Sequence, residues 1–278
     1  MPDPPVRAAR TVVVDGSPVR VVEGGTGPAV LLLHGSGPGT TGSGAWATTI
    51  EALAGSWHLV APDQAGFGGT PLPPGSRGGL RTWTERAAAL MDALGHSSYA
   101  VVGHSMGGAV ALALAAARPG QVTHVVPVST MGAPGAPLSP ALDAVWAAPA
   151  TEEGARDMLS RLVLDRSLVT ESAVAARTAA MQAGAAAFAD LFQPPRARWV
   201  QDLTLPAQTL AAVRAPVLLV HGAQDGVTPL REAALPLLDH LADVRLYVLG
   251  RCGHAPPVEH PREFQRLLAE FLRRPVGG

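Results

Sequence analysis

The motif that constrains the fold most is Gly103-His104-Ser105-Met106-Gly107, which stands between a strand-like run and a helical pattern. The apolar run at residues 99–102 precedes it, and residues 107–117 follow with a helical composition. A serine on a sharp strand-to-helix turn exposes its hydroxyl at the edge of a sheet, and glycines on either side avoid a clash. Free N–H groups at the start of the helix favour negative charge there. The motif therefore predicts a nucleophilic serine.

Short apolar runs and helical patterns alternate along most of the chain. Residues 12–22 are predicted to form a hairpin around Asp15-Gly16-Ser17-Pro18. The alternation beyond it predicts an α/β protein with a mostly parallel central sheet flanked by helices on both faces. Further strands are expected at residues 29–33, 58–61, 99–102, 124–128, 216–220 and 245–249, and helices at 83–94, 107–117, 230–241 and 261–273.

One long segment interrupts this alternation. From about Ala133 to Leu210, no strand-like run separates the helical patterns, and a stretch rich in Gly and Pro opens the segment. Because open parallel sheets bind ligands at the carboxyl ends of their strands, we expect a lid over that edge. The predicted organisation is a helical lid at residues 133–210, inserted into a core domain made of residues 1–132 and 211–278.

A serine at its ordinary pKa needs a general base to act as a nucleophile, and the base needs a group that orients it. Asp225 follows the strand-like run at residues 216–220, and His254 follows the run at residues 245–249. Each residue taken alone could be an ordinary loop residue. The order Ser105, Asp225, His254, with each at a strand end, is the order found in α/β-hydrolases. We therefore predict these three as a catalytic triad.

The tetrahedral intermediate of such a reaction needs two hydrogen-bond donors for its oxyanion. One is predicted to be the backbone N–H of Met106, the residue after the nucleophile. The other should come from the loop after residues 29–33, with Ser36 as the first choice and Gly37 as the alternative. His34 is expected to brace this loop.

Charge and composition argue against several functions. The chain has 21 basic and 22 acidic residues, a formal net charge of −1 and no block of Lys or Arg, which argues against nucleic-acid and membrane partners. The single Cys has no disulfide partner, and no Cys/His cluster has the spacing of a zinc site. No stretch has the length of a membrane span or the pattern of a signal peptide. We expect a cytoplasmic protein that acts on a small-molecule substrate without a metal or cofactor.

These motifs resemble those of the α/β-hydrolases over nearly the whole chain, and more specifically those of the meta-cleavage product hydrolases. The lid motifs carry most weight, because lids diverge quickly among hydrolases that share a triad. The resemblance implies hydrolysis of a C–C bond in a vinylogous diketone acid of the 2-hydroxy-6-oxo-hexa-2,4-dienoate type, and it implies a homodimer. The matching segments are residues 34–39, 61–63, 66–68, 142–146, 165–170, 195–199 and 250–254.

Arg177 aligns by context with the lid arginine that holds the substrate carboxylate in this family. From the sequence alone, Arg177 is the only charged residue between Glu171 and Asp190. Such a residue is either a surface side chain that extends to solvent or a clamp for an anion in a pocket. His104, Trp146 and Ala255 are expected to line the substrate pocket together with Arg177.

Two departures from the family pattern keep an alternative open. Ala255 stands where the family usually has Trp, and His104 stands where Asn is common; both favour ester chemistry. The leading hypothesis is a serine-dependent C–C hydrolase, and the alternative is a carboxylesterase or lactonase. A lyase or cyclase, or a binding protein on the same fold, remains a further alternative because fold and triad do not determine the reaction.

Overall fold

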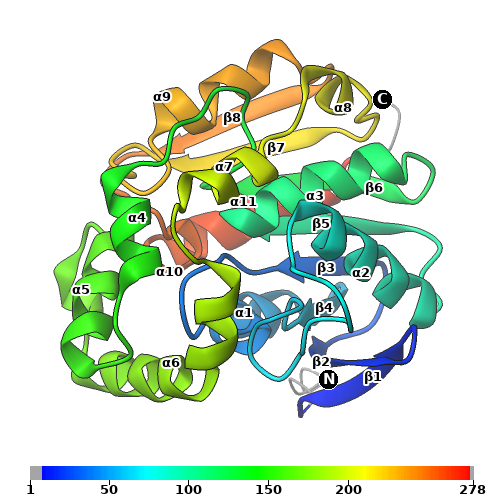
Figure 1. Cartoon of the computed structure of the whole chain (residues 1–278). Coiled ribbons are helices and arrows are strands. Elements are labelled where there is room, and N and C mark those ends of the chain that lie inside the picture. Colours follow the sequence, from blue (N-terminus) through cyan, green and yellow to red (C-terminus); the bar gives the residue numbers. More distant parts are fainter. Residues whose placement is uncertain (1–7, 276–278) are drawn as a thin grey trace.

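In the computed structural model, which describes residues 8–275, eight strands form one sheet (Figure 1). Their order across the sheet is β1-β2-β4-β3-β5-β6-β7-β8, and the strands from β4 to β8 in this order are parallel. Both pairings of β2 are antiparallel. The strands are β1 (Arg10–Val14), β2 (Ser17–Gly24), β3 (Ala29–Leu33), β4 (His58–Pro62), β5 (Tyr99–His104), β6 (Val122–Val128), β7 (Val217–Gly222) and β8 (Val244–Leu249).

Strand β3 lies in the middle of the sheet, and its position explains why its sequence is continuously apolar. All five of its residues are buried, and neighbouring side chains point to opposite faces of the sheet. Leu31 and Leu33 pack in the core on one face, whereas Val30 and Leu32 pack in the core on the other. A parallel strand covered on both faces needs apolar residues at every position, not at alternate ones.

Helices cover both faces of the sheet. Helices α1 and α11 contact each other on one face, while α2 and α8 both contact α3 on the other. In the part of the chain that the structure describes, no helix is long and apolar enough to cross a membrane. Helix α8 (Ala207–Ala211) lies at the end of the insertion between β6 and β7. The helices outside the insertion are α1 (Gly42–Leu53), α2 (Leu80–Ala93), α3 (Met106–Ala117), α9 (Leu230–Ala233), α10 (Pro256–Glu259) and α11 (Pro261–Leu272).

The chain between β6 and β7 is helical, as its sequence pattern predicts. Ser139, Thr151 and Thr170 each cap a helix of this segment, accepting a backbone N–H with the side-chain hydroxyl. The helices that these residues cap are α4, α5 and α6, and in Figure 1 they lie together on the left, near α10. We call residues 133–210 the lid segment; its limits as a separate unit stay a prediction. Its helices, apart from α8, are α4 (Pro140–Ala147), α5 (Glu152–Leu162), η1 (Arg166–Leu168), α6 (Glu171–Leu191) and α7 (Ala197–Leu203).

A broken helix and an added helix are among the differences from the sequence prediction. The helix expected at residues 230–241 breaks: α9 ends at Ala233, and a 3₁₀ helix, η2 (Leu235–Asp239), follows. Pro236 explains the break, because its ring has no N–H to donate and clashes with the preceding turn. Helix α1, which starts after the cap Thr41, was not predicted. The N-terminal hairpin is confirmed, with positive φ angles at Asp15 and Gly16 in its turn.

Candidate active site

Ser105 occupies the sharp turn between β5 and α3. Its φ of 56° and ψ of −117° are strained for a residue with a side chain, and its N–H donates to Val128 O at 2.9 Å. A Cβ at Gly103 would overlap the backbone of Gly107, and a Cβ at Gly107 would overlap that of Leu33. Both glycines of the motif are therefore required for the serine to sit in this turn.

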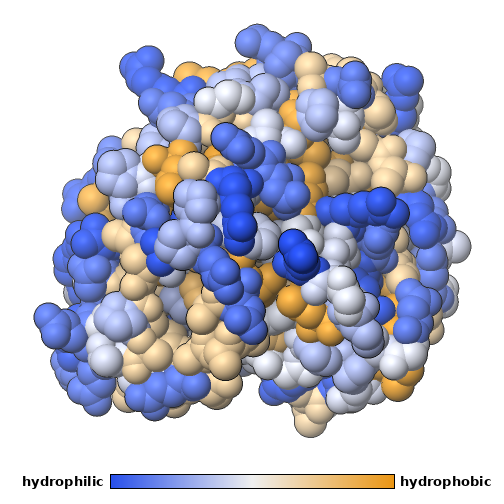
Figure 2. Space-filling model, viewed as in Figure 1, coloured by the Kyte–Doolittle hydropathy of each residue, from blue (hydrophilic) through white to orange (hydrophobic). Residues whose placement is uncertain are grey.

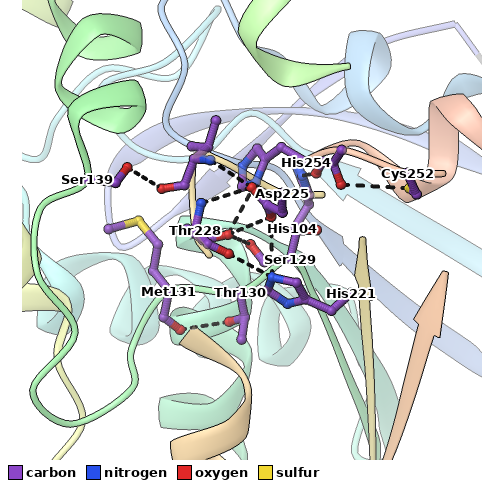
Figure 3. Close-up of polar contacts among 12 residues, drawn as sticks. His104, Ser129, Thr130, Met131, Ser139, His221, Asp225, Thr228, Cys252 and His254 are labelled. Atoms are coloured by element: carbon purple, nitrogen blue, oxygen red, sulfur yellow. Dashed lines mark hydrogen bonds and ion pairs between the residues drawn. The ribbon is translucent and has the colours of Figure 1, made fainter. Parts of the chain in front are cut away.

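Asp225 and His254 come together from the loops after β7 and β8. His254 Nδ1 lies 2.8 Å from Asp225 Oδ2, and both side chains are buried (Figure 3). His254 and Ser105 line the same cavity. Between these two described residues no hydrogen bond is formed; such contacts are often long in a free enzyme and tighten when substrate binds. The three predicted triad residues therefore face one site.

The carboxylate of Asp225 is stabilised by several donors. Oδ1 accepts the N–H groups of Val227 and Thr228 at 2.8 and 2.9 Å. Burial alone would raise the pKa of Asp225, but His254 and His221 beside it hold that pKa well below its ordinary value. Because Asp225 stays ionised, His254 carries its proton on Nδ1, and Nε2 is left as the acceptor for a serine proton.

Thr228 and His221 support this carboxylate, and the sequence analysis did not identify them. Thr228 Oγ1 lies 2.8 Å from Asp225 Oδ2 and 3.0 Å from Ser129 O. His221 Nε2 donates to Thr228 O at 2.7 Å and lies 3.3 Å from Asp225 Oδ2 (Figure 3). The Asp-x-x-Thr spacing was the available signal, since an Asp often accepts hydrogen bonds from residues two and three positions later.

His34 braces the loop after β3. Its Nε2 accepts the N–H of Gln64 at 2.9 Å, so Nδ1 carries the proton and donates to Gly35 O at 2.7 Å. Burial lowers the pKa of His34, which favours this neutral form. The ring therefore connects the loop to the chain after β4 and takes no part in proton transfer.

The predicted oxyanion donors lie around Ser105. Ser36 and Gly37 line the cavity, and Met106 begins α3. Among the described residues, the backbone N–H groups of these three donate to no other atom. Free, preorganised N–H groups beside a nucleophile are what an oxyanion hole requires. The structure leaves both Ser36 and Gly37 available as the partner of Met106.

The structure corrects the prediction for Trp146. This side chain is absent from the lining of the Ser105 cavity, and it lines instead a second cavity of about 280 Å³. Its Nε1–H donates to Ser36 Oγ at 2.9 Å, and its ring stacks on Phe192 with centroids 4.8 Å apart. The indole therefore joins the lid segment to the loop after β3 and lies outside the lining of the Ser105 cavity.

The Ser105 cavity has a volume of about 510 Å³ and lies between the core and the lid segment. On the face shown in Figure 2, hydrophilic residues spread over the outer surface, and strongly apolar ones show mainly in recesses. His104 and Ala255, both predicted to bind substrate, line the cavity. Apolar side chains from the lid segment form much of the remaining wall; they include Leu142, Val145, Leu159, Leu162, Val169 and Ala173.

A single hydrogen bond to the backbone of His254 determines which ring nitrogen of His104 carries the proton. Its Nε2 lies 2.7 Å from His254 O, and since a carbonyl only accepts, Nε2 carries the proton and Nδ1 a lone pair. Burial, together with the nearby His254 ring, lowers the pKa of His104 to about 3. The ring is therefore neutral near neutral pH, and it holds the backbone of the predicted general base.

Arg177 projects from α6 into the same cavity. Its Nη1 donates to Thr40 Oγ1 at 2.9 Å and to Pro38 O at 3.2 Å. Burial lowers the pKa of Arg177, although a guanidinium still keeps its proton. In the described residues, no carboxylate lies within ion-pair distance of Arg177, and Nε and Nη2 have no acceptor. A half-buried cation of this kind, without a counter-charge among these residues, is suited to an anionic ligand.

The fold and the arrangement around Ser105 define a serine hydrolase. The family model of the alpha/beta hydrolase fold matches residues 28–261. A 2-hydroxy-6-oxo-2,4-heptadienoate hydrolase from Pseudomonas putida is 37% identical over 267 residues, which cover 95% of each chain. A 2-hydroxymuconate semialdehyde hydrolase from Pseudomonas sp. strain CF600 is 33% identical, over 95% of this chain and 93% of that one.

Solved structures agree with these relatives. A meta-cleavage product hydrolase from Pseudomonas fluorescens IP01, a serine-to-alanine variant complexed with acetates, superposes with a TM-score of 0.90 at 31% identity. The superposition covers 95% of this chain and 97% of that one. The chain belongs to the α/β-hydrolase family and, within it, to the meta-cleavage product hydrolases.

Proposed function

We propose that this protein hydrolyses the C–C bond of an acid of the 2-hydroxy-6-oxo-hexa-2,4-dienoate type, with Ser105 as the nucleophile. The observation that carries the proposal is the guanidinium of Arg177, which pairs with no carboxylate of the described residues and lies in the cavity that also contains Ser105 and His254. The relatives described above are named for acids or semialdehydes of this kind. A substrate carboxylate would supply the counter-charge that residues 8–275 do not provide.

Arg177 would bind that carboxylate through Nε and Nη2. These two atoms present parallel N–H groups, the geometry that matches both oxygens of a carboxylate. Nη1 is already held by Thr40 and Pro38, so the guanidinium is oriented before substrate arrives. The clamp anchors the dienoate end and places its carbonyl end near Ser105.

The reaction needs an electron sink before the C–C bond can break. The dienol first becomes a ketone: His254 Nε2 takes the proton of the 2-hydroxyl and delivers it to C5 of the substrate, which leaves Nε2 free again. Ser105 then attacks the C6 carbonyl and transfers its proton to His254 Nε2. The N–H groups of Met106 and of Ser36 or Gly37 bind the resulting oxyanion.

Collapse of this intermediate breaks the bond between C5 and C6. The electron pair is delocalised onto the C2 ketone through the double bond between them, and the resulting enolate oxygen at C2 receives a proton from His254, which gives the 2-hydroxy-2,4-dienoate product. The acyl group stays on Ser105 as an ester, and water activated by His254 releases it as an acid. Asp225 keeps the imidazole oriented and stabilises its positive charge at each step.

The test is product analysis with 2-hydroxy-6-oxo-hepta-2,4-dienoate, alongside hydrolysis of p-nitrophenyl acetate. The proposal predicts acetate and 2-hydroxypenta-2,4-dienoate, formed with a higher kcat/KM than that of ester hydrolysis. An inert dienoate together with rapid ester turnover would contradict it. That result would favour the alternative, a carboxylesterase or lactonase. Ala255 and His104, which line the cavity, are the residues that support this alternative.

A further inference from the structure

The backbone of His254 is attached to both the lid segment and the nucleophile turn. Its N–H donates to Leu162 O at 2.8 Å, at the end of α5. Its carbonyl accepts from His104 Nε2 at 2.7 Å. The position of the general base therefore depends on where the end of α5 lies, and not only on Asp225.

Glu259, at the end of α10, binds both sides of this junction. Its Oε1 accepts the N–H of Gly253 at 2.7 Å, next to the general base. Its Oε2 accepts the N–H of Leu164 at 2.6 Å and lies 3.3 Å from the N–H of Asp165. Among the described residues, no Lys or Arg pairs with this carboxylate; its partners are these backbone N–H groups and the thiol of Cys252, whose Sγ lies 3.7 Å from Oε1.

Gly253 shows how closely the two sides approach. A Cβ at this position would lie 3.0 Å from Leu164 N and 3.1 Å from both Glu259 Oε1 and Leu162 O. These contacts are tighter than a real side chain normally makes. The lid segment, Glu259 and the histidine loop therefore meet so closely that a methyl group would fit only if a neighbour moved by a few tenths of an ångström.

We propose that Glu259 is a positioning residue for His254, acting as a clasp between the lid segment and the histidine loop. Its carboxylate holds Leu164 and Gly253 together, and this keeps Leu162 O in place to bind the N–H of His254. The inference rests on the proposed role of Ser105 and His254, but it does not depend on which substrate they act on.

The test replaces Glu259 by Gln. It measures two reactions that need His254 as the general base but do not use the dienoate as substrate. An amide can accept at its oxygen only, and its NH₂ group would face a backbone N–H, so one side of the clasp is lost. We expect about a tenfold decrease, equivalent to about 1.4 kcal/mol, in the rate at which a fluorophosphonate inactivates Ser105. The kcat for p-nitrophenyl acetate should fall by the same factor with KM within about twofold.

Glu263→Gln is the matched control. Glu263 is half-buried like Glu259, but it bonds the hydroxyl of Tyr247 and does not contact the lid segment. Its variant should react with the fluorophosphonate at the wild-type rate. Hydrogen exchange at Leu164 and Gly253 should accelerate in Glu259→Gln only. Faster exchange with unchanged phosphonylation would make Glu259 a lid anchor and overturn the proposal.

Gly253→Ala tests the same junction if Glu259→Gln folds poorly. It keeps the carboxylate but inserts a methyl group between Leu164 and the histidine loop, so it should also slow phosphonylation. Wild-type reactivity in Gly253→Ala would contradict the proposal. If the wild-type protein reacts with the fluorophosphonate but leaves the dienoate intact, the proposed substrate is wrong. The phosphonylation rates of Glu259→Gln and Gly253→Ala still decide whether Glu259 positions His254.

Discussion

Trp146 of α4 donates its indole N–H to Ser36 Oγ at 2.9 Å, in a buried hydrogen bond between the lid segment and the oxyanion loop. Ser36 is also a predicted source of an oxyanion N–H. The lid segment therefore contacts two of the predicted functional groups, Ser36 through its hydroxyl and His254 through its backbone. A lid that moved away would disturb both groups.

Trp146→Phe keeps an aromatic ring against Phe192 but removes the donor to Ser36. Because the hydroxyl loses its partner, we expect the free energy of unfolding to fall by about 1 kcal/mol. The kcat should fall about fivefold for dienoate and ester alike. Trp199→Phe is the control, since Trp199 also packs on Phe192 and its buried Nε1 has no partner in the described residues. Equal kcat losses in both variants would refute a specific role for this bond.

Arg177→Met should impair only substrates that carry a carboxylate. Loss of a charged hydrogen-bonding partner predicts about a 10- to 150-fold rise in KM for the dienoate. Hydrolysis of p-nitrophenyl acetate should change by less than about threefold. Arg166→Met, which alters an exposed arginine of the lid segment, should leave both reactions unchanged. Steady-state kinetics with the two substrates decide the matter, and equal losses on both would eliminate the clamp.

His104→Asn should change how stability depends on pH. The pKa of His104 is about 3 in the folded protein and about 6.5 in an unfolded chain. Between these values the unfolded chain binds a proton that the folded protein does not, so stability is lost as the pH falls below about 6.5. Urea unfolding at pH 7 and pH 5 should show about 1–2 kcal/mol less loss in His104→Asn than in wild type. Identical losses would contradict a buried neutral ring.

Ala255→Trp should narrow the cavity beside His254. Ala255 lines the cavity and is 8% exposed, so a larger side chain has to enter the space that substrate uses. The kcat/KM for a dienoate with a bulky 6-phenyl group should fall at least about tenfold more than that for the 6-methyl compound. Measured ratios that stay at the wild-type value would mean that position 255 does not affect the choice of acyl group.

Local patterns in the sequence predicted the parts of this site that depend on strand ends. Ser105, Asp225 and His254 each follow an apolar run, and a parallel sheet brings such positions to one edge. Helices whose sequence contains residues that disfavour a helix were harder to predict. Two glycines near the start of α1 made that segment resemble a loop. The helical periodicity of residues 230–241 predicted one continuous helix, although Pro236 interrupts it.

Contacts between distant residues could not be predicted from one sequence. Ser36 and Trp146 are 110 positions apart, and Leu164 and Glu259 are 95 apart. From its place near the start of the lid segment, the sequence predicts Trp146 in the substrate pocket, and no local pattern indicates a role for Glu259. Side-chain direction and backbone contacts, which decide both roles, follow from tertiary packing.

The most direct test of the account is turnover of 2-hydroxy-6-oxo-hepta-2,4-dienoate by Ser105→Ala, with wild-type protein in parallel. Ser105 lines the cavity with His254 and Arg177, and the variant removes only a hydroxyl oxygen, so the fold and substrate binding should persist. We predict that kcat falls by at least about a thousandfold while circular dichroism is unchanged. A kcat within a few-fold of wild type would remove Ser105 from the mechanism and contradict the proposed function.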